Sequence, residues 1–103
     1  MRTVIAVSSA HPGLPFLGTR HIARGLRDQV EVLLAQSPDV ELDFSGVNIS
    51  QSFADELVGL LLLRRAPAVL ERLVFKGCSD SVKAVIEFVV ADRYHEYVRT
   101  RSH

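Results

Sequence analysis

The sequence predicts an α/β domain, a small sandwich in which a mixed sheet of three to four strands is covered mainly on one face by helices. Short apolar runs with a period of two alternate along the chain with longer runs whose apolar residues recur every three or four positions, which is typical of this class. The predicted strands span residues 3–7, 40–44 and 72–76. The predicted helices span 20–36, 52 to about 63 or 65, and a stretch that starts at Ser79 or Ser81. With 103 residues, the chain has room for a single domain, residues 1–103.

The first third of the chain combines a strand, a turn-rich loop and a helix. The loop at residues 8–18 is rich in Ser, Pro and Gly, and residues 14–17 within it fit a short edge strand, where a proline is tolerated. Thr19 is the predicted N-cap of the first helix. The apolar residues of that helix share one stripe that would face a sheet: Ile22, Leu26, Val30 and Leu33.

The junction between the second strand and the second helix carries most of the functional signal. Val40, Leu42 and Phe44 alternate with polar residues as in a half-buried strand, and a Ser-Gly pair then ends the run. Ser52 precedes two acids, Asp55 and Glu56. We therefore expect Ser52 to cap the second helix by accepting a hydrogen bond from the Asp55 N–H, with both acids near the positive end of the helix dipole.

Placed at 100° steps, the second helix shows two apolar faces. The broad face would pack on the sheet: Phe53, Ala54, Leu57, Val58, Leu60 and Leu61. The opposite face would carry two acids, a glycine and two leucines: Asp55, Glu56, Gly59, Leu62 and Leu63. This second face is too apolar for water alone. Either a partner protein covers it, or the segment Ala66–Leu70 folds back over the leucines.

The last third of the chain predicts a strand followed by a helix. Gly77 turns the chain after the third strand, and the helix that follows contains Val82, Val85, Ile86 and Val89 at helical spacing. Residues 93–103 either extend this helix or form a loosely ordered tail.

The balance of charge argues against nucleic acid as a partner. The chain has 12 basic and 12 acidic residues and no long run of one sign, whereas a phosphate-backbone binder usually shows a basic stripe. The arginines of the first helix, Arg20, Arg24 and Arg27, are expected on a solvated face, paired with Asp28 and Glu31 at helical spacing.

Targeting and redox signals favour the cytoplasm. The N-terminus lacks the apolar core of a signal peptide, and Cys78 is the single cysteine, so no internal disulfide forms. The apolar run from Leu57 to Leu63 is seven residues long, against about 20 for a membrane span. We therefore expect no membrane association.

The pattern of reactive side chains predicts no enzyme, no metal and no cofactor. The four histidines lack the spacing of a metal site, and no nucleophile elbow or phosphate-binding glycine pattern exists. Cys78 is interpreted as a small buried residue. Asp55 and Glu56 are adjacent, so their side chains diverge by about 100° on a helix and do not form a catalytic carboxylate pair.

Two segments resemble a known family. Leu42-Asp43-Phe44-Ser45-Gly46-Val47 and Ser52-Phe53-Ala54-Asp55-Glu56 resemble the strand and helix start of STAS-like domains of unknown function, small relatives of the sulphate-transporter and anti-sigma-factor-antagonist domain. Phe16-Leu17-Gly18-Thr19-Arg20 resembles the loop and first-helix start of the same domains, so the resemblance covers roughly residues 14–90. Typical STAS domains carry D-S-S/T-G at the junction, with its first serine phosphorylated by a protein kinase. This chain has Gln51-Ser52-Phe53-Ala54 there, which makes Ser52 the phosphorylation candidate.

The resemblance implies a non-enzymatic, bacterial-type regulatory module that binds a protein partner, either a histidine-kinase-like ATPase or an anti-sigma-type regulator. The predicted partner surface is the junction with the outer face of the second helix: Ser50, Gln51, Ser52, Asp55, Glu56, Gly59, Leu62 and Leu63. The alternative is a constitutive homodimer or structural domain, held by the leucines of the second helix, with no phosphorylation switch.

Overall fold

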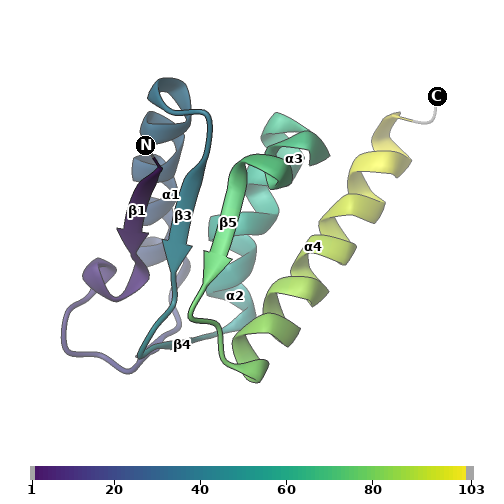
Figure 1. Ribbon diagram of the computed structural model, residues 1–103. Coiled ribbons are helices and arrows are strands. Elements are labelled where there is room, and N and C mark those ends of the chain that lie inside the picture. Colours follow the sequence, from purple (N-terminus) through teal and green to yellow (C-terminus); the bar gives the residue numbers. More distant parts are fainter. Residues whose placement is uncertain (1, 102–103) are drawn as a thin grey trace.

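The computed structural model, which describes residues 2–101, confirms the predicted α/β class (Figure 1). The main sheet has three strands in the order β1-β3-β5, and a second sheet pairs β2 with β4. Their bounds are Thr3–Ala6 (β1), Phe16–Leu17 (β2), Val40–Asp43 (β3), Asn48–Ile49 (β4) and Leu73–Lys76 (β5). All the strand pairs are parallel, so the expected mixed sheet is in fact parallel, because a helix follows each strand of the main sheet and returns the chain to the same end.

The helical part of the described chain forms three long rods and two short 3₁₀ turns. Helix α1 is followed, after β4, by a central rod made of three consecutive segments. The bounds are Arg20–Gln36 (α1), Gln51–Ala54 (α2), Asp55–Gly59 (η2, a π-helix), Leu60–Arg65 (α3) and Asp80–Arg101 (α4), with 3₁₀ turns at Val7–Ala10 (η1) and Pro67–Arg72 (η3). Helix α4 thus extends through residues 93–101, and only the end of the expected loose tail lies outside the described residues.

The helices cover one face of the main sheet, as predicted. Figure 1 shows α1 and the central rod behind the strands, with α4 beside β5 at the edge of the molecule. Ile5 and Leu42, which are neighbours on adjacent strands, are buried on the helix side. Val4 lies on the other side of β1 and is 55% exposed. The core is therefore a single layer between the sheet and the helices.

The predicted starts of α1 and α4 agree with the structure. The hydroxyl of Thr19 accepts a hydrogen bond from the Ile22 N–H at 3.4 Å, and that of Ser79 accepts one from the Val82 N–H at 3.1 Å. Ser79, rather than Ser81, therefore caps α4. On α1, Leu26 and Val30 of the predicted stripe are buried, while Ile22 and Leu33 are half-buried against the core.

The predicted cap of the second helix is wrong. Ser50, not Ser52, caps α2: its hydroxyl accepts from the Phe53 N–H at 3.0 Å and donates to the Gly18 carbonyl oxygen at 2.8 Å. The short strand β4, which the sequence analysis missed, brings the chain to Ser50 already aligned for the helix. Ser52 consequently lies exposed in the first turn.

The π-helical segment η2 explains why the predicted faces of the central rod are right for Leu61 but wrong for Leu60 and Leu62. The Leu60 N–H donates to the Asp55 carbonyl oxygen, so this turn contains one residue more than an α-turn. The residues that follow are rotated back by about 100° relative to a uniform α-helix. Leu62 is therefore fully buried, on a helix that contacts α4 and η3, whereas Leu60 and Leu63 are half-buried.

Backbone strain is concentrated at Ala66, between α3 and η3. Its φ of 77° and ψ of 159° lie in a region that is favourable almost only for glycine. Such a conformation costs alanine on the order of 1–3 kcal/mol. This strain exceeds the extra conformational entropy that glycine would lose on folding, about 0.5–1 kcal/mol. We predict that Ala66→Gly raises the free energy of unfolding by about 1 kcal/mol, measured by urea denaturation.

The control for this prediction is Ala68→Gly in η3. Ala68 is exposed and has no positive φ, so glycine there should lower the free energy of unfolding by up to about 1 kcal/mol. Equal losses in both variants would show that Ala66 carries no strain.

Candidate functional site

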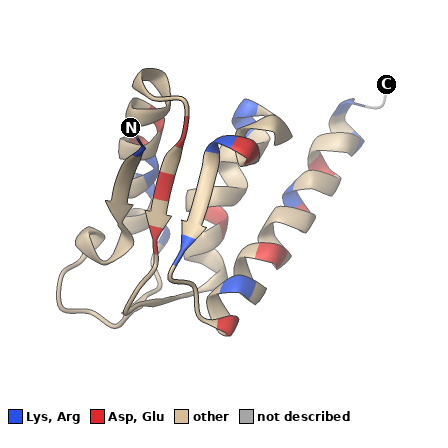
Figure 2. Cartoon of the chain, in the orientation of Figure 1, with Lys and Arg blue, Asp and Glu red and all other residues tan. Residues whose placement is uncertain are grey.

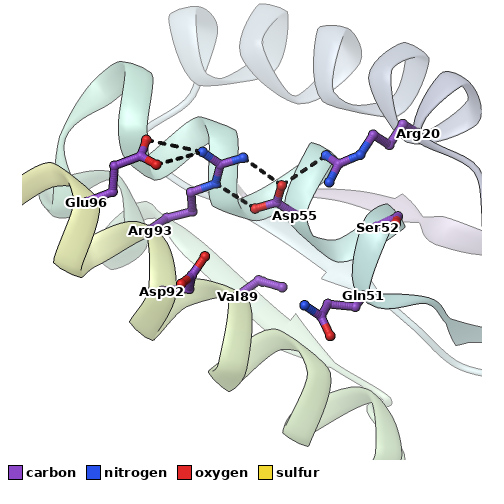
Figure 3. A pocket seen from close by; sticks show the side chains of 8 residues that line it. All are labelled: Arg20, Gln51, Ser52, Asp55, Val89, Asp92, Arg93 and Glu96. Atoms are coloured by element: carbon purple, nitrogen blue, oxygen red, sulfur yellow. Dashed lines mark hydrogen bonds and ion pairs between the residues drawn. The ribbon is translucent and has the colours of Figure 1, made fainter.

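The centre of the site is Asp55, the first residue of η2. Its side chain accepts two hydrogen bonds from Arg93 on α4, Nε to Oδ1 and Nη2 to Oδ2, both at 2.7 Å. Arg20, the first residue of α1, donates to Oδ2 from Nη1 at 2.9 Å. Asp55 is only 8% exposed. This single carboxylate therefore connects the central rod to both neighbouring helices (Figure 3).

Glu56 makes a second cluster of ion pairs, on the α1 side. Arg27 Nη1 donates to Glu56 Oε2 at 2.6 Å and to the Glu56 carbonyl oxygen at 3.0 Å. Arg24 lies 3.6 Å from the same carboxylate, and Arg20 Nη1 lies 3.4 Å from Oε1. Arg27 is itself buried, so its charge is compensated within the protein rather than by water.

The two adjacent acids diverge, as predicted. Asp55 is directed to α4 and Glu56 to α1, and Arg20 alone contacts both. Arg20 Nη1 lies 2.9 Å from Asp55 Oδ2 and 3.4 Å from Glu56 Oε1 and so bridges the two carboxylates.

The arginines keep both acids ionised. Hydrogen bonds from Arg93, and then from Arg20, hold the pKa of Asp55 below its usual range despite burial. Burial would raise the pKa of Glu56, but hydrogen bonds from Arg27 and Arg20 together lower it. Asp55 in turn raises the pKa of Arg93. Neither acid has a proton to donate near neutral pH.

Burial corrects the predicted outer face of the second helix. Asp55, Glu56, Gly59 and Leu62 are buried, because α1 and α4 cover the rod on two sides and supply the arginines. The expected pairing of the α1 arginines along their own helix is also wrong, since they bind the acids of the rod across the helix interface. Glu31 pairs instead with Arg64 and Arg65.

Gly59 provides the space for the ion pair between Asp55 and Arg93. A Cβ atom at position 59 would lie 2.5 Å from Asp55 Oδ1 and 3.0 Å from Arg93 Cγ. The absence of a side chain at position 59 therefore allows Arg93 of α4 to approach the central rod closely within the same chain.

A pocket of about 510 Å³ opens beside this ion pair, between the start of α2 and the middle of α4 (Figure 3). Its lining is polar apart from one valine: Arg20, Gln51, Ser52, Asp55, Val89, Asp92, Arg93 and Glu96. Two arginines against three acids give the lining a formal charge of −1. Arg93 is engaged by Asp55 and Glu96, whereas Asp92 makes no ion pair within residues 2–101.

Comparison with known proteins identifies the family. Residues 23–83 match the STAS-like domain of unknown function (DUF4325), and this span is more than half of the chain. The chain belongs to this family. No curated protein and no solved structure matches it.

The span that matches the STAS-like family contains only part of the site. It includes both acids of η2 and most of α1, but it ends shortly after the start of α4. Arg20 and Arg93, which hold Asp55 from either side, lie outside it. The ion pair to α4 is therefore a feature established by this structure rather than by the match.

The structure brings together three of the predicted site residues of this STAS-like domain. Gln51, Ser52 and Asp55 line the pocket, and Ser50 lies next to them as the helix cap. Glu56, Gly59, Leu62 and Leu63 do not line it.

Sequence reasoning missed the contribution of α4, namely Asp92, Arg93 and Glu96. One signal was present: Arg93 continues the apolar spacing of Val82, Ile86 and Val89, and an arginine on a buried stripe requires an anionic partner.

Other candidate chemistry is sparse in the described part of the chain. Cys78 is half-buried beside a smaller apolar pocket, and burial raises the pKa of its thiol. Residues 2–101 contain no group of three potential metal ligands. Nor does any helix within them have the length and apolar character needed to cross a bilayer.

The space at Gly59 yields a paired prediction. Gly59→Ala should lower the free energy of unfolding by about 1–3 kcal/mol, because the methyl group displaces Asp55 from Arg93, although alanine is favoured in helices by about 1 kcal/mol. Gly25→Ala, on the exposed side of α1 with no atom within 4 Å, should instead raise it by up to about 1 kcal/mol. Chemical denaturation of the two variants measures both values. A stabilising Gly59→Ala would mean that the ion pair tolerates the methyl group.

The ion pairs of Asp55 predict a specific response to acid. Asp55→Asn should lower the free energy of unfolding at pH 7 by about 2–4 kcal/mol, because Arg93 keeps its charge and loses its counter-ion. A carboxyl whose pKa is lowered on folding contributes stability above its unfolded pKa, near 4, and loses it as the pH falls through the folded pKa. Between pH 5 and 2, the variant should therefore lose less stability than the wild type in urea titrations.

Asp92→Asn is the matched control for Asp55→Asn. Asp92 lines the same pocket without an ion pair in the described chain, so its loss should change the free energy of unfolding by less than about 0.5 kcal/mol. Similar pH profiles for the wild type and Asp55→Asn would contradict the assignment of this acid dependence to Asp55.

Proposed function

We propose that this STAS-like domain is a non-enzymatic regulatory module that binds a protein partner at the pocket between α2 and α4. The observation that supports this proposal is the convergence of Gln51, Ser52 and Arg20 at one accessible pocket. Ser52 and Arg20 belong to the two segments that resemble STAS-like domains, and the hydrogen bond from Arg20 to Asp55 joins these segments across 35 positions. Asp55, which lines the pocket, is fully paired with Arg20 and Arg93 and so is not a free carboxylate.

The chemistry of the pocket favours a partner that presents a basic side chain. The lining carries a net negative charge, and the Asp92 carboxylate has no counter-ion in the described chain. Gln51 and Ser52 at the rim offer additional hydrogen bonds. By the family resemblance, the partner would be a histidine-kinase-like ATPase or an anti-sigma-type regulator.

Ser52 is accessible for use as a phosphorylation switch. Its side chain is exposed and is not needed as the helix cap, because Ser50 has that role. A phosphate there would add about −1.5 to −2 charge in the first turn of α2. Repulsion from Asp55 is reduced, since Arg93 and Arg20 already balance that carboxylate.

The alternative, a constitutive homodimer held by the leucines of the second helix, has less support. Leu62 is fully buried and Leu63 is half-buried inside one copy of the chain. These leucines do not offer an exposed apolar seam.

Site-specific photo-crosslinking tests the proposed surface. A benzophenone amino acid at position 51 should form an adduct with the partner in an extract of the source organism, because Gln51 is exposed at the pocket. The same amino acid at Gln36, which is also exposed and is the last residue of α1, should form no adduct. Mass spectrometry of the adducts identifies the partner.

Substitution of Ser52 then separates a switch from simple binding. If Ser52 is phosphorylated to regulate binding, Ser52→Asp should change the adduct yield at position 51 several-fold while Ser52→Ala leaves it unchanged. Adducts of equal yield at positions 51 and 36 would contradict the proposed surface. Equal yields for the two Ser52 variants, with no phosphate on the intact protein, would contradict the switch.

A further inference from the structure

Helix α4 carries two stripes of residues on nearly opposite sides, one apolar and one made of alanine and aromatic-ring side chains. One stripe is buried against the core: Val82, Ile86 and Val89. The other is exposed to solvent: Ala84, Phe88, Ala91 and His95. Phe88 is 57% exposed, and Tyr94 beside this stripe is 47% exposed. Figure 1 shows α4 at the edge of the molecule, where its outer side faces no other element. We call the second stripe the outer seam.

The outer seam has the spacing of a helix-pairing surface. Its residues are separated by four, three and four positions, the repeat with which two helices interlock along their length. Large and small side chains alternate along it, so a large residue of one helix can fill the space beside a small residue of another. A helix face that contacts only water does not need large and small side chains to alternate in this way.

We propose that the outer seam pairs with the same seam of a second copy of this chain, with the two α4 helices antiparallel. In the register that sets Phe88 against Ala91 of the other copy, Ala84 lies level with His95. Phe88 of each copy then packs against the Ala91 methyl group of the other, and His95 packs against the Ala84 methyl group. The contact is self-complementary, as a two-fold symmetric dimer requires.

The distribution of charge on α4 favours the antiparallel direction. The start of the helix contains Asp80, Lys83 and Glu87, with a net charge of −1, and its last turn contains Arg99 and Arg101 (Figure 2). An antiparallel pair places the two arginines of each copy beside Asp80 of the other. A parallel pair would place arginine against arginine and Asp80 against Asp80, which is unfavourable.

This interaction does not depend on the proposed partner site. The outer seam lies on the side of α4 away from the core stripe, whereas Val89 and Arg93 face the pocket and the core, and Asp92, four positions after Phe88, lies between the pocket and the seam. A dimer through the seam leaves Gln51 and Ser52 accessible. Failure of one proposal would therefore leave the other standing.

Analytical ultracentrifugation of the full chain tests the dimer. The wild type should show a concentration-dependent monomer–dimer equilibrium, and Phe88→Glu should weaken dimerisation by roughly 30-fold or more. Val32→Glu on α1 is the matched control, since Val32 is also 57% exposed, and it should dimerise like the wild type. Circular dichroism checks that both variants fold. Ala91→Glu provides a second test of the seam if Phe88→Glu is unfolded. A monomeric wild type at several hundred micromolar, or dimers of undiminished strength in both seam variants, would overturn the proposal.

Disulfide trapping tests the direction of pairing. In a Cys78→Ser background, which removes the natural thiol, mixed Ala84→Cys and His95→Cys proteins should form a disulfide-linked dimer on mild oxidation. Neither variant alone should do so in the antiparallel register. Efficient self-linking of Ala84→Cys alone would indicate parallel pairing and overturn the antiparallel arrangement.

Discussion

The contact between Asp55 and Arg93 determines how the helices of this domain are arranged. A carboxylate only 8% exposed would be strongly unfavourable without a counter-ion, and Arg93 reaches it across 38 positions of sequence. Gly59 leaves room for the guanidinium, and Arg20 brings in α1 from the other side. The position of α4 and the shape of the pocket follow from this one arrangement.

The sequence predicts those parts of the fold that local patterns determine. The alternation from Val40 to Phe44 and the cap at Thr19 depend on neighbouring residues only, and both agree with the structure. The assignment of Ser52 as the cap was wrong because a Ser–x–x pattern starts equally well at Ser50, and the choice depends on how β4 positions the chain. Ser50 and Ser52 carry the same hydroxyl group, so their hydrogen-bonding capacity alone does not show which of them caps the helix.

The candidate site is less predictable, because its residues are joined by long-range ion pairs. The sequence marks Asp55 and Glu56 as candidate site residues, but a helical wheel cannot show that two further helices cover them. Their burial changes their interpretation, from part of a partner-binding surface to a paired centre that holds the domain together. What remains available to a partner is the rim of the pocket, where Gln51 and Ser52 stay exposed.

The π-helical segment makes the orientation of α3 depend on the number of residues before it. Inserting one more α-helical residue into the rod would rotate α3 by about 100° and turn Leu62 away from its buried position, whereas removing one residue between positions 55 and 59 would convert the turn to α-helix and leave α3 facing as it does now. Most of the exposed loop at residues 8–18 has no such constraint, and a change of length there alters only the loop itself. Variation in length among relatives of this domain should therefore avoid the central rod, apart from the loss of one residue at η2.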